Sequence, residues 1–241
     1  MLVLFAFLFS WNIDTSLSSP LIVQPLPDHA LWTAELRKYV TPEGVIDYST
    51  WKKNQGPLDT YLSQISIAQP VSNWSKNVQL SYWINLYNAY TVKLILDHYP
   101  VQSIKDINSG GGPWDLLWIH IGTKTYSLNQ IENDIIRMQF RDPRVHFALN
   151  CGARSCPPLL SEAFDPVKLE AQLNGCTQSF IQNTVFNQTT QPTVRLSSIF
   201  DWYMADFGPD LFAFLNQYAT TPINAGTKIE YLDFDWSINE K

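Results

Sequence analysis

The chain has 241 residues, of which 45% are hydrophobic and 16% are charged. A chain this long and this apolar can bury a core without disulfides or metal ions, so the composition excludes a mainly disordered protein. Its 22 acidic against 16 basic residues give a formal net charge of -6, which argues against binding of nucleic acid through overall charge. Three Cys and four His are too few for a disulfide-dense scaffold or a zinc-finger array.

An uninterrupted apolar run occupies residues 2–9, and small and polar residues follow it at 16–19. This pattern is typical of a secretory signal peptide, and the run is far too short to span a bilayer as a helix. We therefore expect a signal peptide at 1–19, an extended lead-in at 20–27 and a single domain at 28–241, exported to the periplasm or secreted. The alternative is an apolar N-terminal helix packed on that domain.

The first half of the domain has mostly helical signals. Asp28 can cap a helix that runs to about residue 40, residues 45–48 are typical of a short extended segment, and residues 57–67 predict another helix. The strongest helix prediction covers residues 79–98, because apolar side chains recur there at helical spacing, at Trp83, Tyr87, Tyr90 and Leu94.

Strand signals enter in the middle of the chain. Residues 117–121 and 124–126, joined through a Gly-Thr pair, predict a hairpin. Ser127, with Gln130 three residues later, forms the capping box of a helix that ends near Asp142. Helical spacing predicts that the buried face of this helix consists of Leu128, Ile131, Ile135 and Met138.

Residues 145–150 predict a strand by alternation, with His146 on the side opposite to Val145, and a loop follows at 151–158. Later elements are a helix opened by Asp165-Pro166, a strand, two short helices and a terminal strand, at 165–183, 194–196, 198–205, 209–218 and 228–236. Helices outweigh strands, so we expect an α+β fold: one compact, helix-rich domain with a small, mostly antiparallel sheet.

The loop after the predicted strand contains two of the three Cys, Cys151 and Cys156. A nucleophilic thiolate needs a base and a positive environment, which His146 and Arg154 can supply. The alternatives are a disulfide between the two Cys or a pair of buried thiols. A zinc site is a third reading, although four ligands are hard to find nearby.

Two Asn on the strongest predicted helix have the spacing of one helix face. Asn85 and Asn88 are three residues apart among aromatic residues, and a mid-helix Asn is costly unless its amide finds partners. They could orient an imidazole or donate to an oxyanion. They could equally tie down the backbone of a neighbouring loop.

Glu132 and the arginines complete the set of candidates. Glu132 lies beside the apolar face of its helix, so we expect it to be half-buried with a partner such as His146 or an Arg. Four of the six Arg lie in one stretch of sequence: Arg137, Arg141, Arg144 and Arg154. This local positive patch suits an anionic or carboxylate-bearing ligand, whereas the alternative for Arg137 and Arg141 is ordinary ion pairing.

Several motifs together resemble the domain of unknown function 547 family. They are Tyr82-Trp83-Ile84-Asn85-Leu86-Tyr87-Asn88-Ala89, the run from Asp142 to Ala153, Ser155-Cys156-Pro157, Phe200-Asp201-Trp202-Tyr203, Asp206-Phe207 and Asp235-Trp236-Ser237-Ile238-Asn239. The resemblance covers roughly residues 30–239. It implies an exported protein whose important residues are Asn85, Asn88, Glu132, His146, Cys151 and Cys156, but it implies no established activity.

Three functions remain open. The first is a Cys-dependent hydrolase or acyl/amide transferase with Cys151 or Cys156 as nucleophile, His146 as base, Glu132 or an Asn as orienting group, and Asn85 or Asn88 with loop amides at the oxyanion. The second is a binding module in which a Cys151–Cys156 bridge shapes a cleft for a small molecule or peptide, held by Arg144, Arg154, Trp83 and Tyr203. The third is a metal-dependent enzyme using His146, Glu132 and a Cys. The first two need no cofactor or metal.

Overall fold

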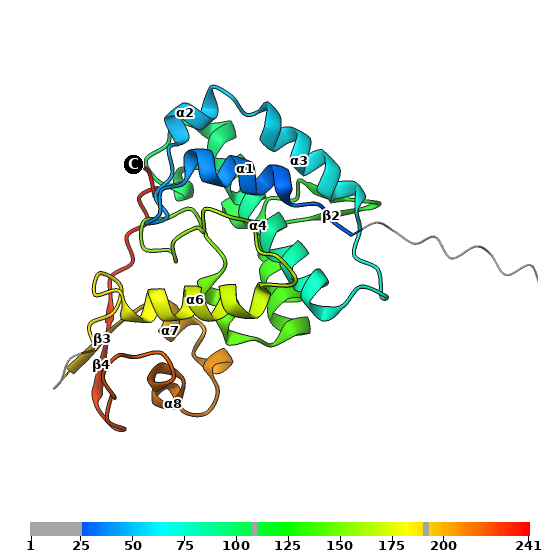
Figure 1. The fold of residues 1–241 in the computed structure, drawn as a ribbon. Helices are drawn as coiled ribbons and strands as arrows, with labels where there is room; N and C mark the ends of the chain where they lie inside the picture. Colours follow the sequence, from blue (N-terminus) through cyan, green and yellow to red (C-terminus); the bar gives the residue numbers. More distant parts are fainter. Residues whose placement is uncertain (1–25, 108–109, 190–192) are drawn as a thin grey trace, which may run out of the picture.

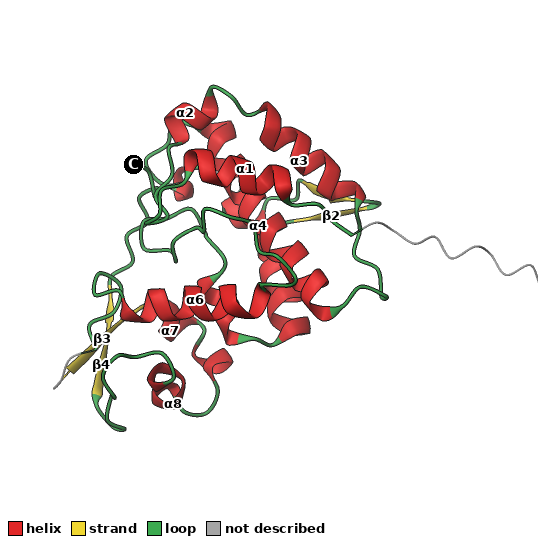
Figure 2. Ribbon diagram, viewed as in Figure 1, coloured by secondary structure: helices red, strands yellow, loops and turns green. Residues whose placement is uncertain are grey.

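The computed structural model describes residues 26–107, 110–189 and 193–241. These residues form a helix-rich single domain with two small two-stranded sheets, one antiparallel and one parallel (Figures 1 and 2). The predicted α+β class is confirmed, with two separate sheets in place of one. The predicted signal peptide at 1–19 and most of the lead-in lie outside the described residues.

Helix α4 (Lys76–His98) runs through the middle of the fold, next to a layer of shorter helices (Figure 1). That layer consists of α1 (Ala30–Tyr39), α2 (Tyr48–Lys52) and α3 (Gly56–Ile67). The Ser75 side chain caps α4 by accepting the N–H of Val78. The predicted apolar stripe is buried, but so are most other positions of α4 on every face, as befits the central helix of a core.

The predicted hairpin is present, as strands β1 (Ile119–Ile121) and β2 (Lys124–Tyr126), which pair antiparallel. Two short 3₁₀ turns precede it, η1 (Ile104–Asp106) and η2 (Pro113–Asp115). The capping box of Ser127 and Gln130 also forms, at the start of α5 (Leu128–Gln130). The sequence pattern therefore located this part of the chain correctly.

The helix after the capping box winds differently from the prediction. From Ile131 to Phe140 it is a π-helix, η3, in which residues five apart are hydrogen-bonded. The wider turn changes the buried face, which consists of Ile131, Ile135, Ile136 and Phe140. Met138 is 65% exposed, so its predicted burial, which assumed α-helical spacing, was wrong.

The predicted strand at 145–150 was also wrong. Residues Pro143–Phe147 form a 3₁₀ helix, η4, because Asp142 caps the Arg144 N–H and Pro143 occupies the first turn. All six side chains from 145 to 150 are buried, so the alternation in the sequence does not separate an inner from an outer face. The consequence for function is that His146 lies on a tight turn and not on a strand.

The last third of the chain forms the other end of the domain (Figure 1). Its elements are α6 (Leu169–Gln182), β3 (Thr193–Ser197), α7 (Ile199–Trp202), η5 (Met204–Phe207), α8 (Leu211–Asn216) and β4 (Lys228–Leu232). Strands β3 and β4 pair in parallel, from Thr193 opposite Lys228 to Ser197 opposite Leu232. A cluster of phenylalanines, including Phe147 and Phe207, packs this end together.

After β4 the chain returns across the domain to the layer of α1 and α2 (Figure 1). On the way it lies along the loop that contains both Cys, where Arg154 donates its N–H to the Ser237 carbonyl and Asn239 donates to the Gly152 carbonyl. Ile46 then donates to the carbonyl of Asn239. In the parts of the chain that the structure describes, no helix combines the length and apolarity that a membrane crossing requires.

Candidate functional site

A cavity of about 260 Å³ brings together residues from the middle and the end of the chain. Four of the residues singled out in the sequence line it: Glu132, His146, Cys151 and Tyr203. The rest of its lining is mostly aromatic and apolar, with Tyr87, Trp114, Asp115, Asn129, Leu149, Pro157, Ile199, Trp202, Phe234 and Trp236. Chemically reactive side chains thus share one hollow with large aromatic walls.

His146 is held by a carboxylate. Its Nε2 lies 2.7 Å from Oδ2 of Asp206, and the same oxygen accepts a bond from Nε of Arg137 at 2.7 Å. The bond from His146 keeps the pKa of Asp206 well below its usual value, and the bond from Arg137 acts in the same direction. A carboxylate at Nε2 fixes the ring orientation and leaves Nδ1 without a hydrogen-bond partner among the described residues.

Tyr203 holds the other side of this arrangement. Its ring stacks on the His146 imidazole with centroids 4.0 Å apart, and the Arg137 guanidinium lies 4.7 Å from the centre of the Tyr203 ring. His146 is only 4% exposed. Packing and hydrogen bonding therefore restrict the imidazole to one orientation at the cavity wall.

Glu132 is the second positioned acid–base group. One of its oxygens accepts the hydroxyl of Tyr87 at 2.9 Å, and the other accepts that of Tyr203 at 2.6 Å. Burial, and then the charge of Glu132, raise the pKa of both tyrosines well above the usual value, so both hydroxyls stay protonated and donate. Glu132 is half-buried, as predicted, but its partners are phenols and not His146 or an Arg.

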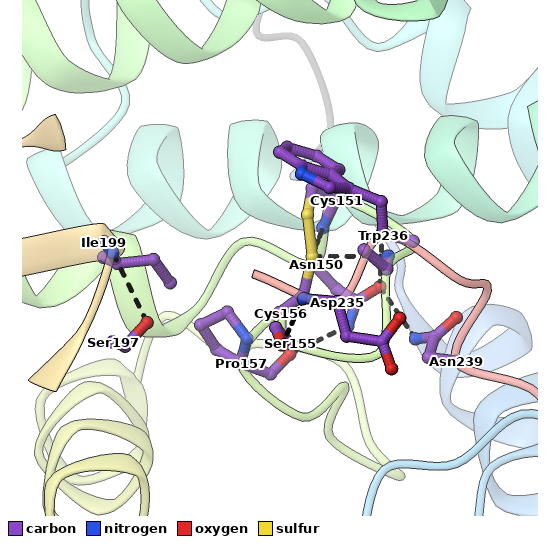
Figure 3. Close-up of a disulfide and its surroundings, with 12 residues drawn as sticks. Asn150, Cys151, Ser155, Cys156, Pro157, Ser197, Ile199, Asp235, Trp236 and Asn239 are labelled. Atoms are coloured by element: carbon purple, nitrogen blue, oxygen red, sulfur yellow. Dashed lines mark hydrogen bonds between the residues drawn. A yellow bond between two sulfur atoms is a disulfide. The ribbon is translucent and has the colours of Figure 1, made fainter. Parts of the chain in front are cut away.

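Cys151 and Cys156 are joined by a disulfide, with Cα atoms 6.0 Å apart (Figure 3). Cys151 lines the cavity with His146, whereas the buried Cys156 lines a different cavity, beside Arg154. The Cys156 sulfur accepts the backbone N–H groups of Cys151 and Ala153 at 3.2 and 3.4 Å. The two cysteines therefore have unlike surroundings, and Cys151 is the one that shares a cavity with His146.

The third cysteine, Cys176, is a free thiol inside α6. Burial raises its pKa to about 12. At neutral pH it is a buried apolar side chain and not a nucleophile.

Asn88 ties down the loop that contains the disulfide. Its amide donates to the Ala148 carbonyl and accepts the N–H of Asn150, at 2.9 and 2.8 Å. The Asn150 side chain in turn donates to the Pro157 carbonyl and accepts from Gly152 and from the Asn239 amide (Figure 3). Asn88 thus acts on the site through the backbone, which is one of the two roles its sequence position indicates.

The remaining candidates lie elsewhere. Asn85 is fully buried, and its side-chain amide donates to the Phe164 carbonyl and accepts the Phe164 N–H. Trp83 packs edge-on against Tyr82 in the core. Arg144 is paired with Asp142 and Glu170, and the exposed Arg154 lies 4.0 Å from Asp235. The cavity around His146 contains none of these side chains in its lining.

Sequence reasoning missed the most informative partner of His146, which is Asp206. The Asp206-Phe207 motif is part of the family resemblance, but Asp206 lies 60 positions after His146 in the sequence and no local spacing links the two residues. Tyr87 and the aromatic walls formed by Trp202, Phe234 and Trp236 were also not assigned to the site. In the described ranges, no group of three or more His, Cys, Asp or Glu is placed to hold a metal ion.

Comparison with known proteins supports the family resemblance over part of the range that the motifs cover. Residues 71–181 match the family described as Protein of unknown function, DUF547. The matched segment contains Asn88, Glu132, His146 and the disulfide, whereas Tyr203, Asp206 and the walls from α7 and the C-terminal segment lie beyond the match. No curated protein and no solved structure matches the chain.

Proposed function

We propose that the protein is an exported Cys-dependent hydrolase or acyl/amide transferase whose nucleophile, Cys151, is stored in a disulfide. The observation that carries the proposal is the bond from His146 Nε2 to Asp206, because it orients an imidazole that lines the same cavity as Cys151. Thiol-dependent acyl transfer uses a carboxylate that orients an imidazole and an imidazole that activates a thiol, and reduction of the disulfide would supply the thiol here. The disulfide is also consistent with export, because such bonds persist in oxidising compartments.

Each group has one role in this proposal. Asp206 orients His146 through the bond to Nε2, and Nδ1 of His146 takes the proton from the Cys151 thiol. The thiolate attacks an acyl carbonyl, the leaving group departs with the proton from His146, and a thioester forms on Cys151. Water or an amine then attacks the thioester, which returns the sulfur as a thiol. Asn88 is a positioning residue, because it holds the Cys151 loop through Ala148 and Asn150.

Activation requires a thiol reductant. An external thiolate attacks the Cys151 sulfur from the cavity, the sulfur–sulfur bond breaks, and Cys156 leaves as a thiolate. The N–H groups of Cys151 and Ala153 already point to that leaving sulfur and would stabilise its charge. A second thiolate then releases Cys151, and the reductant leaves as its own disulfide.

The test is the alkylation rate of Cys151 as a function of pH. The protein is reduced with a phosphine, the phosphine is removed, and iodoacetamide adducts are mapped by mass spectrometry. We expect the rate to reach half its plateau well below about pH 8.5, because His146 stabilises the thiolate. His146→Ala should raise that midpoint, and Asp206→Asn should shift it measurably. The matched control is Asp201→Asn, because Asp201 is exposed on α7.

Cys176 gives an internal reference in the same experiment, because its buried thiol should stay unmodified while the protein is folded. If the midpoint of Cys151 is the same in His146→Ala as in the unchanged protein, the imidazole has no part in activating the thiol. Failure of Cys151 to react at all in reduced, folded protein would also contradict the proposal.

The disulfide favours a second candidate, a non-catalytic binding module. In that function the bridge only shapes the loop beside the aromatic cavity, and the protein works in the oxidised state. The two candidates differ in the alkylation experiment. In a binding module the reduced Cys151 has an ordinary midpoint at about pH 8.5 that His146→Ala does not move.

A further inference from the structure

The charge of the cavity around His146 is opposite to that of the arginine-rich stretch of sequence. Its lining includes two carboxylates, Asp115 and Glu132, and no Lys or Arg. Asp115 accepts the amide of Asn129 at 2.8 Å, and Glu132 accepts two phenol hydroxyls. All three donors are neutral, and no ion pair within 4 Å joins either carboxylate to a basic side chain in the described residues.

The arginines are used elsewhere. Arg137 and Arg141 line a separate cavity with Asp206, and Arg154 lines the cavity beside Cys156. Arg144 is engaged by Asp142 and Glu170. The positive charge of this part of the sequence therefore does not face the space in front of His146.

The walls of that space suit a cation. Trp202 and Trp236 stack with centroids 5.8 Å apart, and Phe234 and Trp114 lie 4.6 and 5.6 Å from Trp236. An aromatic face attracts an ammonium group through its negative quadrupole, most strongly for Trp. The chain itself contains one such contact here, because the Lys105 ammonium lies 3.5 Å from the centre of the Trp236 ring.

We infer that the cavity binds a ligand or substrate group with an ammonium head, such as an alkylamine or an amine-bearing side chain of a peptide. Glu132 would pair with the head group, and Trp202 and Trp236 would cover its flank. This inference rests on the proposal that the His146 cavity is the ligand site. It also favours an amine as the acyl acceptor: Nδ1 of His146 takes one proton from the ammonium group, the neutral amine attacks the thioester, and a second amine proton returns to the Cys151 sulfur as it leaves. The protein would then be an amide transferase more than a hydrolase.

The experiment compares three unbranched six-carbon probes with different heads: hexylammonium, hexanol and hexanoate. Binding to the oxidised, full-length protein is followed at neutral pH by calorimetry and by the fluorescence of the cavity tryptophans. We expect hexylammonium to bind at least about tenfold more tightly than hexanol, and hexanoate to bind more weakly than both.

Two variants test the assigned residues. Glu132→Gln keeps the size of the side chain and removes its charge, so it should remove most of the preference for hexylammonium and leave the affinity for hexanol nearly unchanged. Trp202→Leu, at a side chain that is 48% exposed, should reduce the same preference without loss of folding. The control is Asp134→Asn, because Asp134 is an exposed carboxylate on the same helix and outside this cavity.

Equal affinities for the three probes, tighter binding of hexanoate, or an unchanged preference in Glu132→Gln would each overturn the inference. These results do not depend on a free thiol, because the protein is tested in its disulfide form. Loss of the ammonium preference would leave a His146-dependent alkylation midpoint intact, so failure here and failure of the proposed chemistry can be told apart.

Discussion

Asp206 is a half-buried carboxylate with two donors on one oxygen, His146 and Arg137. Its depressed pKa in the folded protein makes it a source of pH-dependent stability. In the unfolded chain the Asp206 carboxylate binds a proton at about pH 3.9, whereas in the folded protein its pKa is lower and it binds the proton only at more acidic pH. The stabilisation is therefore complete above about pH 4 and is lost as the pH falls toward the folded pKa.

We expect Asp206→Asn to weaken this loss of stability in acid. The measurement is the free energy of unfolding in urea at a series of pH values from neutral to acidic. The slope of that free energy below about pH 4 should be smaller in Asp206→Asn than in Asp201→Asn, whose carboxylate has no such bonds. Identical slopes in the two variants would show that the bonds to His146 and Arg137 do not contribute.

The buried His29 should make the stability of the protein depend on pH in a different range. Its Nδ1 lies 2.8 Å from the Tyr61 hydroxyl, its Nε2 is buried without a partner in the described residues, and burial lowers its pKa to about 4. Between about pH 6.5 and that value the unfolded chain binds a proton that the folded protein excludes, so stability should fall as the pH falls through this range. His29→Gln should flatten the fall, and His120→Gln, at an exposed His, should not.

Residue chemistry alone located part of the site. His146, Glu132 and Cys151 stood out because groups of these types lie close together in sequence, and the cavity contains all three. Asp206 and the aromatic walls did not stand out, because their partners are far away in sequence and only the tertiary fold brings them near. For Asn85 and Asn88 the spacing predicted that both amides have partners, but it could not distinguish an amide that faces a ligand from one that binds loop backbone.

At the scale of elements, the loop that contains the disulfide is packed against the turn at Gly44. This glycine has φ +80°, a left-handed conformation that disfavours other residues. A Cβ at position 44 would lie 2.7 Å from the Cα of Pro158 and 2.8 Å from the N of Leu159. Backbone atoms leave little room to relax, so a side chain here would disturb the loop just after Cys156.

Gly44→Ala should accordingly destabilise the protein by more than about 1–2 kcal/mol, which is the cost of the left-handed backbone alone. Gly175→Ala is the matched control in the other direction. Gly175 is an exposed residue inside α6 with open space around it, so Ala should stabilise the protein by about 0.5–1 kcal/mol. Chemical denaturation of both variants measures the two effects, and similar stabilities would contradict the packing described for Gly44.

Element boundaries followed the sequence well at several caps and breaks. Ser127 with Gln130, and the helices α1, α3 and α4, formed close to the predicted positions. The predicted opening of a helix at Asp165 was wrong, because α6 begins four residues later, at Leu169. Two other errors arose where periodicity was the only guide. The π-helical turn of η3 shifts the buried face. In η4 the alternating residue types predicted a strand, but the side chains are buried on all sides of a 3₁₀ helix. Local pattern cannot distinguish these cases, because tertiary packing decides them.

For the molecule as a whole, the disulfide should contribute a modest amount to stability. Cys151 and Cys156 are five residues apart, and closing so short a loop in the unfolded chain is worth about 2 kcal/mol. We expect Cys156→Ser to lower the free energy of unfolding by about this much, and a phosphine to lower that of the unchanged protein equally. The phosphine should have no further effect on Cys156→Ser. A loss of several times this size would indicate that the bridge also holds the wider fold.

The overall class was predictable because composition and helix signals are properties of the entire chain. The arrangement of the last third was not, since the parallel pairing of β3 with β4 and the return of the C-terminal segment to Ile46 depend on contacts between distant residues. Those contacts also place Trp236 in the wall of the cavity.

The bond from His146 to Asp206 crosses the edge of the segment that matches the DUF547 family, which ends at residue 181. A protein engineer who transplanted residues 71–181 into another scaffold would carry over the sulfur and the imidazole. The transplant would lack the carboxylate that aligns the imidazole and the rings that enclose the hollow. Any redesign of this cavity therefore has to include the stretch from Ile199 to Trp236, and a comparison confined to the matched segment would omit that part of the lining.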